Sequence, residues 1–281
     1  MLTTKTKVAL AGLAYRFITL GRAMAGKNNS ATVRRGGLQW SLDLSEGIDF
    51  SIYLLGAFER STVATLQKLV KPSDVVFDVG ANMGAHTLGL ARSVGSAGQV
   101  FAFEPADFAF AKLQRNLALN PELEARTHPR QLLLAATATE RAQPEIYASW
   151  PLEQNDAVHP KHRGRLVTTR NATTDTLDQV VAREGIDRLN LIKIDVDGHE
   201  LPVLQGGLAT LAKFRPILVM EMSPYVHAEE HNSFAALVAL LRDARYAIQH
   251  AGNWEPLPLE AAELEALIPD GASINVIARP E

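Results

Sequence analysis

The 281-residue sequence contains no cysteine, and this absence restricts both its chemistry and its setting. Without cysteine the fold uses no disulfide, no thiolate metal site and no cysteine nucleophile. A chain without thiols is compatible with a reducing cytoplasm, which is the expected location. Positive charge is not in excess either, because the formal net charge is −3. With no general basic field to hold a phosphate backbone, duplex nucleic acid is not expected as a partner.

The segment at residues 8–15 is apolar but too short to span a bilayer. It is flanked by Lys5, Lys7, Arg16 and Arg22, and it predicts an amphipathic helix. Two roles stay open for this helix. One is packing within the molecule or in a homo-oligomer, and the other is peripheral contact with an anionic membrane surface through the basic side chains.

Patterning along the chain predicts three parts. Residues 1–32 form the amphipathic helix and a polar linker, residues 33–72 a small cap, and residues 73–281 the main domain. Strict alternation over residues 38–44 predicts a half-buried strand in the cap. Pro72 ends the helix that leads into the main domain.

The main domain alternates apolar runs with helical patterns, which is typical of an α/β fold. Several runs are continuously apolar, as expected when helices cover both faces of a mostly parallel sheet. The segment at 274–278 is expected to pair next to the strand at 246–250. The buried strands are predicted at 75–79, 99–103, 131–135, 191–195, 217–221 and 246–250.

About fifty-five residues separate the predicted strands at 131–135 and 191–195, more than a single crossover needs. We expect an insertion at about 144–172 that contains a hairpin with strands at 145–149 and 166–171. The connection between these strands is either a substrate lid or an ordinary solvated loop. Its basic side chains are His159, Lys161, His162, Arg163 and Arg165.

Residues 75–84 read Val-Val-Phe-Asp-Val-Gly-Ala-Asn-Met-Gly, and the next predicted strand ends in Glu104-Pro105. A buried strand thus enters a glycine turn where backbone can approach a ligand, and a neighbouring carboxylate can accept hydrogen bonds from ribose hydroxyls. A dinucleotide fingerprint requires glycine at the position of Asn82, so pyrophosphate binding is disfavoured. The pattern favours S-adenosylmethionine, which has no phosphate. The competing interpretation is a tight turn in a protein whose ligand lies elsewhere.

Two stretches, Asp-Val-Gly-Ala-Asn-Met-Gly at 78–84 and Ile-Lys-Ile-Asp-Val-Asp-Gly-His-Glu at 192–200, resemble the signatures of the FkbM family of S-adenosylmethionine-dependent methyltransferases. The resemblance covers roughly residues 35–279. It implies a Rossmann-like, seven-stranded class I fold and O-methylation of hydroxyl groups on sugars, glycans or natural products. The family usually has glutamate at the position of Asp197, so the carboxylate here is one methylene shorter. Further similarity lies at residues 53–59, 176–178, 203–207 and 215–216.

We expect the donor to bind around the first two strands, with Glu104 on the ribose. Asp78 either fixes the turn or meets the methionine amino group, and Thr87 meets the carboxylate at the helix start. Ala135 or Ala136 is placed for adenine, and Tyr53 or Glu59 closes over the methionine end. His86 lines the turn or is a solvated first-turn residue. The predicted cofactor-binding residues are Asp78, Gly80, Asn82, Gly84, Thr87, Glu104, Pro105, Ala136, Asp195 and Glu59.

Methyl transfer to an alcohol requires a group that takes the hydroxyl proton. His199 is the expected general base, oriented by Asp197 or Glu200, unless it only caps its helix. Asp195, at the carboxyl end of its strand, belongs to the donor pocket or to the catalytic group. Alternatively Asp195, Asp197 and Glu221 gather around Mg²⁺. Candidates for the acceptor pocket are Trp150, Tyr225, His227 and Trp254.

The sequence therefore predicts an O-methyltransferase that converts S-adenosylmethionine to S-adenosylhomocysteine and acts on a sugar, glycan or natural product. The alternatives are methylation of nitrogen, a lipid-linked or RNA-bound acceptor, and an inactive cofactor-binding module.

Overall fold

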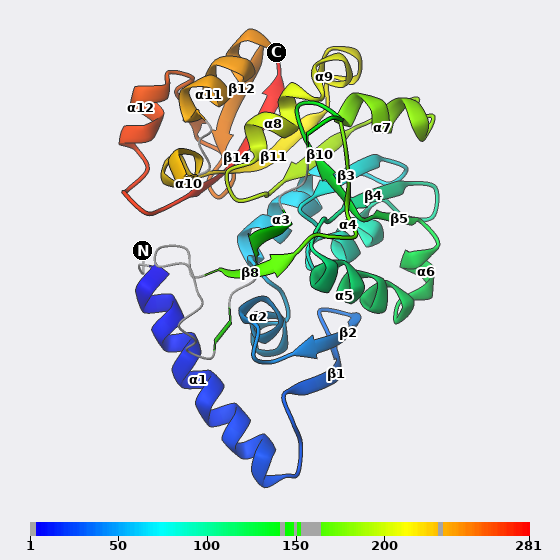
Figure 1. Cartoon of the computed structure of the whole chain (residues 1–281), viewed down its shortest axis with the longest axis vertical. Helices are drawn as coiled ribbons and strands as arrows, with labels where there is room; N and C mark the ends of the chain where they lie inside the picture. Colours follow the sequence, from blue (N-terminus) through cyan, green and yellow to red (C-terminus); the bar gives the residue numbers. More distant parts are fainter. Residues whose placement is uncertain (1–3, 141–143, 149–150, 153–163, 230–232) are drawn as a thin grey trace.

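The computed structural model describes residues 4–140, 144–148, 151–152, 164–229 and 233–281. Its centre is an eight-stranded sheet in the order β13-β12-β14-β11-β10-β3-β4-β5 (Figure 1). Neighbours from β11 to β5 run parallel, while β14 is antiparallel to both β11 and β12. The strands are β3 (Val75–Val79), β4 (Gln99–Phe103), β5 (Thr127–Arg130), β10 (Leu191–Ile194), β11 (Ile217–Met222), β12 (Tyr246–His250), β13 (Pro256–Leu257) and β14 (Ile274–Pro280).

Side chains alternate between the two faces of the sheet and enter two separate cores. Phe77 and Ile192 point into one core, while their neighbours Val76 and Leu191 point into the other. The first core is completed by α7 (Leu177–Arg183), α8 (Glu200–Gln205), α9 (Leu208–Phe214), α11 (Phe234–Asp243) and α12 (Ala261–Ala266). The second is completed by α3 (Arg60–Leu69), α4 (Thr87–Ser93), α5 (Asp107–Ala118) and α6 (Pro121–Glu124). The expected α/β architecture, a mostly parallel sheet covered on both faces, is confirmed.

One predicted strand is misplaced. The apolar run at 131–135 lies outside the main sheet, because β6 (Leu132–Leu134) pairs with β9 (Thr173–Asp175) in a separate two-stranded sheet. The edge of the main sheet is instead β5, whose sequence Thr-His-Pro-Arg is polar. An edge strand tolerates proline because one side of its backbone has no strand to bond.

The chain begins with α1 (Thr4–Met24), which confirms the predicted helix. The cap follows with a hairpin and α2 (Gly47–Leu55). The hairpin pairs β1 (Ser30–Arg35) with β2 (Leu38–Asp43), so its first strand starts inside the predicted linker. Gly56 ends α2 in a left-handed conformation with φ of 84°. The cap is fixed to α5, where the Asn116 side chain accepts a hydrogen bond from the Ser41 amide at 2.8 Å.

The predicted insertion hairpin is present as β7 (Glu145–Ala148) paired antiparallel with β8 (Arg165–Thr168). Its inner side packs Ile146 and Val167 against Ala106 and Ala109 at the start of α5, directly after Glu104-Pro105. Arg165 forms an ion pair of 2.8 Å with buried Glu46 of the cap. Most of the connection between these strands lies outside the described residues, including His159, Lys161, His162, Arg163 and Trp150.

Among the helices in the described part of the chain, none combines the length and apolar character needed to cross a membrane.

Candidate active site

The predicted motifs meet where the sheet order reverses, between β3 and β10. Asp78 is paired in register with Lys193, so the residues that follow the two strands are neighbours. The Asp195 amide donates to the Val79 carbonyl oxygen at 3.1 Å, and the Gly80 amide donates to the Phe103 carbonyl oxygen at 3.0 Å. Open α/β sheets bind ligands at such a switch point. The sheet topology therefore places the ends of β3, β4 and β10 around one site.

The glycine turn after β3 is required by protein packing. Gly80 has φ of 76°, and a Cβ there would lie 1.8 Å from the Asp195 carbonyl oxygen. Gly84 has φ of 93°, and a Cβ there would meet side-chain atoms of Leu88 and Leu113 at 2.8 and 2.9 Å. Contacts within the protein thus already require glycine at both positions. Backbone contact with a cofactor stays a prediction for both.

Glu104 is 4% exposed and holds the turn through both carboxyl oxygens. Oε2 accepts a hydrogen bond from the Asn82 amide, and Oε1 accepts one from the Ala106 amide, each at 2.8 Å. Burial raises the pKa of Glu104 to about 7, although these two bonds oppose the rise. A carboxylate offers about four lone-pair positions. Glu104 therefore retains the capacity to accept further hydrogen bonds.

Asp78 is completely buried beneath the turn. Its Oδ2 accepts a hydrogen bond from the Thr87 hydroxyl at 2.6 Å, and its Oδ1 lies 3.3 Å from Lys193 Nζ. Of the two roles considered for Asp78, this environment favours fixing the turn over meeting a ligand. Thr87 is also fully buried and holds Asp78, so its expected contact with the donor carboxylate stays a prediction that this geometry does not favour.

Lys193 is the site residue that the sequence analysis missed. Its Nζ donates to the Gly80 carbonyl oxygen at 3.0 Å and lies 3.4 Å from Asp195 Oδ2. Burial acts to lower the pKa of Lys193, but the charges of Asp78 and Asp195 outweigh it and raise the pKa. A signal was available in the sequence. A lysine inside an otherwise apolar strand must find a buried counter-charge, because an unpaired buried charge is costly.

Three further carboxyl groups, those of Asp195, Asp197 and Glu221, lie near one another at the carboxyl ends of β10 and β11, in a region that we call the recess. The side chain of Asp195 is 31% exposed, yet burial raises its pKa, as does the charge of Glu59. Asp197 is exposed on a turn with φ of 47°, and burial together with Asp195 and Glu200 raises its pKa to about 8. Burial also raises the pKa of Glu221, together with the charges of Asp195 and Asp197. Desolvation by the surrounding protein is the largest cause of all three raised pKa values.

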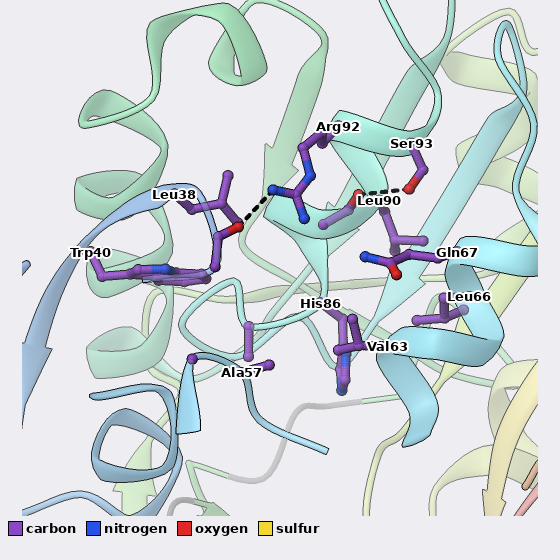
Figure 2. A pocket seen from close by; sticks show the side chains of 14 residues that line it. Leu38, Trp40, Ala57, Val63, Leu66, Gln67, His86, Leu90, Arg92 and Ser93 are labelled. Carbon is purple, nitrogen blue, oxygen red and sulfur yellow. Dashed lines mark hydrogen bonds between the residues drawn. The ribbon is translucent and has the colours of Figure 1, made fainter. Parts of the chain in front are cut away.

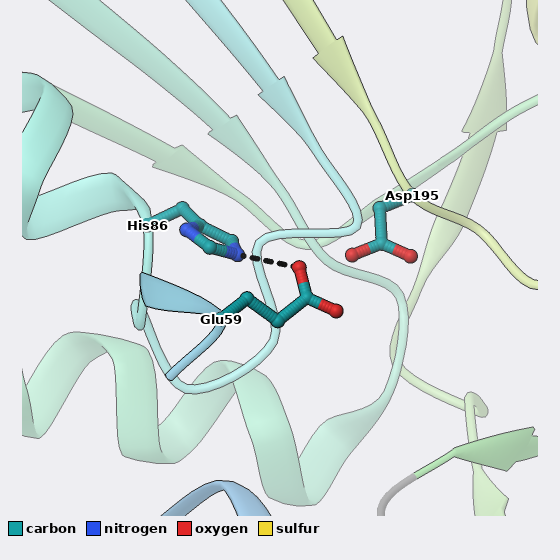
Figure 3. Close-up of side chains that lie close together, drawn as sticks. All are labelled: Glu59, His86 and Asp195. Atoms are coloured by element: carbon teal, nitrogen blue, oxygen red, sulfur yellow. Dashed lines mark ion pairs between the residues drawn. The ribbon is translucent and has the colours of Figure 1, made fainter. Parts of the chain in front are cut away.

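Glu59 and His86 complete the recess on the side of the cap (Figure 3). Glu59 precedes α3 with φ of 46°, and its Oε2 lies 3.6 Å from His86 Nε2. Burial acts to raise the pKa of Glu59, but contact with His86 and the charge of Lys193 outweigh it, so the pKa is lowered. His86 is only 5% exposed. The interpretation of His86 as a solvated residue is therefore wrong, because α3 and the cap cover it.

The expected partners of His199 are arranged differently. Glu200 is 2% exposed, accepts a hydrogen bond from the Val196 amide at 3.2 Å, and lies 3.1 Å from His227 Nε2. It therefore holds the turn and contacts His227, while its expected role in orienting His199 stays a prediction. His227 is fully buried, so the expectation that it lines the acceptor pocket is wrong. His199 is half-buried before α8 and makes no capping hydrogen bond with its side chain. Its role as a base stays a prediction.

The remaining candidates are placed as follows. Pro105 is buried beside Glu104. Ala135 has no exposed surface, whereas Ala136 is half-exposed, so only Ala136 is open to a ligand. Tyr225 is half-buried, and Trp254 packs between Lys68 and Arg279.

The expected magnesium ligands do not gather. Within the described residues, the group of three ligand-type side chains with all ligand atoms within 4.8 Å of one another is Glu59, His86 and Asp195. Asp197 and Glu221 do not join it, and the Glu221 carboxylate is bonded to Ser273. Their pKa values respond to Asp195 through longer-range charge.

A separate hollow lies behind His86, between the cap and α4 (Figure 2). Its volume of about 160 Å³ is too small for a nucleoside cofactor. It is lined by apolar side chains such as Trp40 and Leu66, and Arg92 closes one side by donating to the Gly36 carbonyl oxygen at 2.7 Å. The donor site is thus distinct from this hollow.

Comparison with known proteins gives a consistent result. The sequence matches the methyltransferase FkbM domain over residues 78–248. It is 26% identical over 161 residues to the hexuronic acid methyltransferase AglP of Haloferax volcanii, covering 57% of this chain and 61% of that protein. It is 30% identical over 159 residues to the methyltransferase sdnD of Sordaria araneosa, covering 47% and 59%. The chain spans about three fifths of the length of these relatives.

A methyltransferase FkbM structure from Methylobacillus flagellatus KT aligns over 77% of this chain and 50% of that chain, with a TM-score of 0.42 and 16% identity. The sheet described above has the mostly parallel, Rossmann-like arrangement that the resemblance implied, with eight strands where seven were expected. The region matched by the domain covers more than half of the sequence and includes the motifs after β3 and β10. The chain belongs to the FkbM methyltransferase family.

Proposed function

We propose that this protein transfers a methyl group from S-adenosylmethionine to a hydroxyl group of a sugar, glycan or natural product. The observation that carries the proposal is the position of Glu104. A buried carboxylate with unused lone pairs stands beside the glycine turn, and a recess rich in carboxyl groups adjoins it. The Glu104 carboxylate suits the ribose hydroxyls of the donor. The neighbouring carboxyl groups suit the positive charges of the donor.

The recess has the electrostatic character that a sulfonium donor requires. Burial raises the pKa values of Asp195, Asp197 and Glu221, and the charges of neighbouring carboxyl groups add to the rise. S-adenosylmethionine brings a sulfonium and an ammonium group. Binding of these cations lowers the pKa values and releases protons. The donor therefore leaves at least one carboxylate ionised and able to act as a base.

Methyl transfer then reverses this balance. The acceptor oxygen forms a bond to the methyl carbon, the carbon–sulfur bond breaks, and its electron pair stays on sulfur. The sulfonium charge disappears as the acceptor hydroxyl releases its proton. Asp197, with a pKa of about 8 without the donor, is the carboxyl group we assign to take that proton. Asp195 and Lys193 hold the charge around it, and His199 is the alternative base on the same turn.

Support for a hydroxyl on a sugar comes from one relative, because AglP is described as a hexuronic acid methyltransferase. At 26% identity this similarity supports a class of acceptor and does not specify the molecule. Methylation of nitrogen, of an RNA-bound or lipid-linked acceptor, or binding without turnover are the outcomes that would replace the proposal.

Donor binding is tested first, by calorimetry with S-adenosylmethionine, S-adenosylhomocysteine and NAD. We expect saturable binding of the first two. A Glu104→Ala variant should bind them at least a hundredfold more weakly, since the two ribose hydroxyls lose their hydrogen bonds to a charged group. Glu122→Ala, which removes an exposed glutamate on α6, is the matched control. Saturable binding of NAD with no binding of S-adenosylmethionine would overturn the proposal.

Transfer is tested with methyl-labelled donor and pooled glycans and metabolites, followed by identification of the methylated atom. His199→Ala should leave donor binding within about fivefold of wild type, and Asp197→Asn should do so at pH 6, below the pKa of about 8 that Asp197 has without donor. If Asp197 is the base, Asp197→Asn should lower kcat by two to four orders of magnitude. Full turnover by Asp197→Asn together with loss in His199→Ala would transfer the role to the imidazole.

A further inference from the structure

We propose that Glu59, His86 and Asp195 bind a divalent transition-metal ion, Mn²⁺ or Zn²⁺, at the donor end of the recess. Binding of the ion is independent of the proposed function. Its role in the reaction, which is to hold the acceptor hydroxyl, rests on that function.

Three elements bring the ligands together. Glu59 stands before α3, His86 before α4, and Asp195 after β10, and one ligand atom from each lies within 4.8 Å of the other two. Figure 3 shows the imidazole and the Glu59 carboxylate facing one another, with the Asp195 carboxylate on the far side of Glu59. Metal–ligand distances of 2.0–2.2 Å place ligand atoms about 3 to 4.4 Å apart. Small side-chain movements therefore suffice to enclose an ion.

His86 supplies a second, independent indication of a ligand. The side chain is 5% exposed, and neither ring nitrogen has a hydrogen-bond partner within the described residues. Its closest charged group is Glu59 Oε2, at 3.6 Å from Nε2, which is too long for a hydrogen bond. A buried polar group without a partner is unfavourable. An ion bound to Nε2 would satisfy it.

The surrounding charge favours a cation in this position. Besides the three ligands, the recess contains the carboxyl groups of Asp197 and Glu221. Two further carboxyl groups, those of Glu104 and Asp78, are buried beside it. Among the described residues, Lys193 forms ion pairs with Asp78 at 3.3 Å and Asp195 at 3.4 Å, and it also donates to the Gly80 carbonyl oxygen at 3.0 Å. One ammonium group does not balance the carboxylates.

The ligand types select the class of ion. Two carboxylates and one imidazole suit Mn²⁺ or Zn²⁺ better than Mg²⁺ or Ca²⁺, which prefer oxygen alone. The backbone of Glu59 supports a fixed ligand position, because this non-glycine residue is held at φ of 46°. Such strain is retained where the surrounding structure requires one side-chain position. The remaining coordination positions of the ion are available to a hydroxyl, whose acidity a bound cation increases.

The test uses the full-length protein, treated with EDTA and dialysed. Mn²⁺ is titrated and followed by electron paramagnetic resonance, and Zn²⁺ by calorimetry, without any donor or acceptor. We expect one site per chain and a pulsed-resonance signal from one imidazole nitrogen. Glu59→Gln and His86→Phe should each weaken Mn²⁺ binding at least a hundredfold, and His86→Phe should remove the nitrogen signal. Glu221→Gln, in the same recess, should weaken binding less than tenfold.

Circular dichroism and thermal denaturation establish that each variant is folded, and Asp195→Asn provides a third ligand change if one of the others is not. Absence of a stoichiometric site, or equal effects of Glu59→Gln and Glu221→Gln, would overturn the metal site. Methyl transfer that persists in EDTA would overturn the role of the ion but leave the proposed function intact. Metal binding by a protein that transfers no methyl group would overturn the proposed function but leave the metal site intact.

A second inference comes from α1: we propose that its exposed face binds an anionic lipid bilayer. One side of the helix packs into the cap, where Tyr15 is 6% exposed. The other side carries an apolar stripe with about a one-turn spacing, whose members are 55%, 69%, 62% and 83% exposed. The stripe consists of Leu13, Phe17, Leu20 and Met24.

Charge complementarity selects the occupant of this face. No acidic residue precedes Asp43, although the whole chain has a net charge of −3. Arg16 is exposed on the same helix as the stripe, and a basic side chain on a helix with an exposed apolar face is typical of helices that lie in the interface of anionic membranes. A second copy of the chain would bring the same positive charge to the contact, which is unfavourable. The basic residues before Asp43 are Lys5, Lys7, Arg16, Arg22, Lys27, Arg34 and Arg35.

The test is co-sedimentation of the protein with phosphatidylcholine vesicles that contain or lack phosphatidylglycerol. We expect binding only to the anionic vesicles, with affinity falling as salt rises. Phe17→Ser/Leu20→Ser should weaken binding at least tenfold, and Arg16→Gln or Lys27→Gln about fivefold each. Leu267→Ser, a 57% exposed leucine beyond α12, is the control. Equal binding to both vesicles, or a dimer that Phe17→Ser/Leu20→Ser dissociates without lipid binding, would overturn this assignment.

Discussion

Replacement of Glu104 by glutamine should change how stability depends on pH. In the folded chain burial raises the pKa of Glu104 to about 7 from an ordinary value of 4.5. Below pH 4.5 both states hold the proton. Between 4.5 and 7 the unfolded chain releases a proton that the folded chain retains, so the wild-type stability falls as pH rises. The difference between the two pKa values corresponds to about 3 kcal/mol, and above pH 7 this group contributes no further change.

The glutamine variant lacks this ionisation and should lack this part of the fall. Its carbonyl oxygen can accept from only one of the two amides, those of Asn82 and Ala106, which Glu104 holds at 2.8 Å. The loss of one bond costs about 1–3 kcal/mol at low pH. We therefore expect Glu104→Gln to be less stable than wild type near pH 4.5. The deficit should shrink by about 3 kcal/mol by pH 8.

The measurement is urea denaturation of metal-free, donor-free protein at several pH values from 4.5 to 8. Because the other carboxyl groups of the recess are present in both proteins, their contributions largely cancel in the difference. Glu122→Gln, on the exposed side of α6, controls for loss of one negative charge. Parallel stability curves for wild type and Glu104→Gln across this range would refute the argument that burial keeps the Glu104 proton.

Four further predictions concern the glycines, the buried ion pair and the donor site. Gly80→Ala should destabilise the fold by more than about 3 kcal/mol, because its Cβ would lie 1.8 Å from a carbonyl oxygen. Gly89→Ala, in α4 with open space around it, should stabilise by about 0.5–1 kcal/mol in the same urea assay. Lys193→Met should cost about 3–5 kcal/mol, since Asp78 is left buried without its counter-charge, and adding Asp78→Asn should recover part of the loss; full stability of the single variant contradicts this. Donor affinity of metal-free protein should rise between pH 6 and 8 as protons are released, and Asp197→Asn should flatten that rise in calorimetry.

The sequence alone located the chemistry because the signals for it are local. Strands β3, β4 and β12 have the bounds predicted from the sequence. Glu104 and Asp195 were found for the same reason, since each directly follows a buried strand and parallel strands end at one edge of a sheet. The edge strand β5 escaped detection because it is polar and contains Pro129, and a half-buried edge needs no apolar run.

Only the tertiary structure decided which polar groups meet. Lys193 neutralises Asp78 because β10 lies beside β3, although 115 residues separate them in the chain. His86 is buried because the cap and α3 fold over the turn, and that same packing brings Glu59 toward Asp195. Periodicity in a sequence reports whether a side chain faces a core or solvent. It does not report which distant segment supplies the counter-charge, because that depends on strand order and on how the cap rests on the sheet.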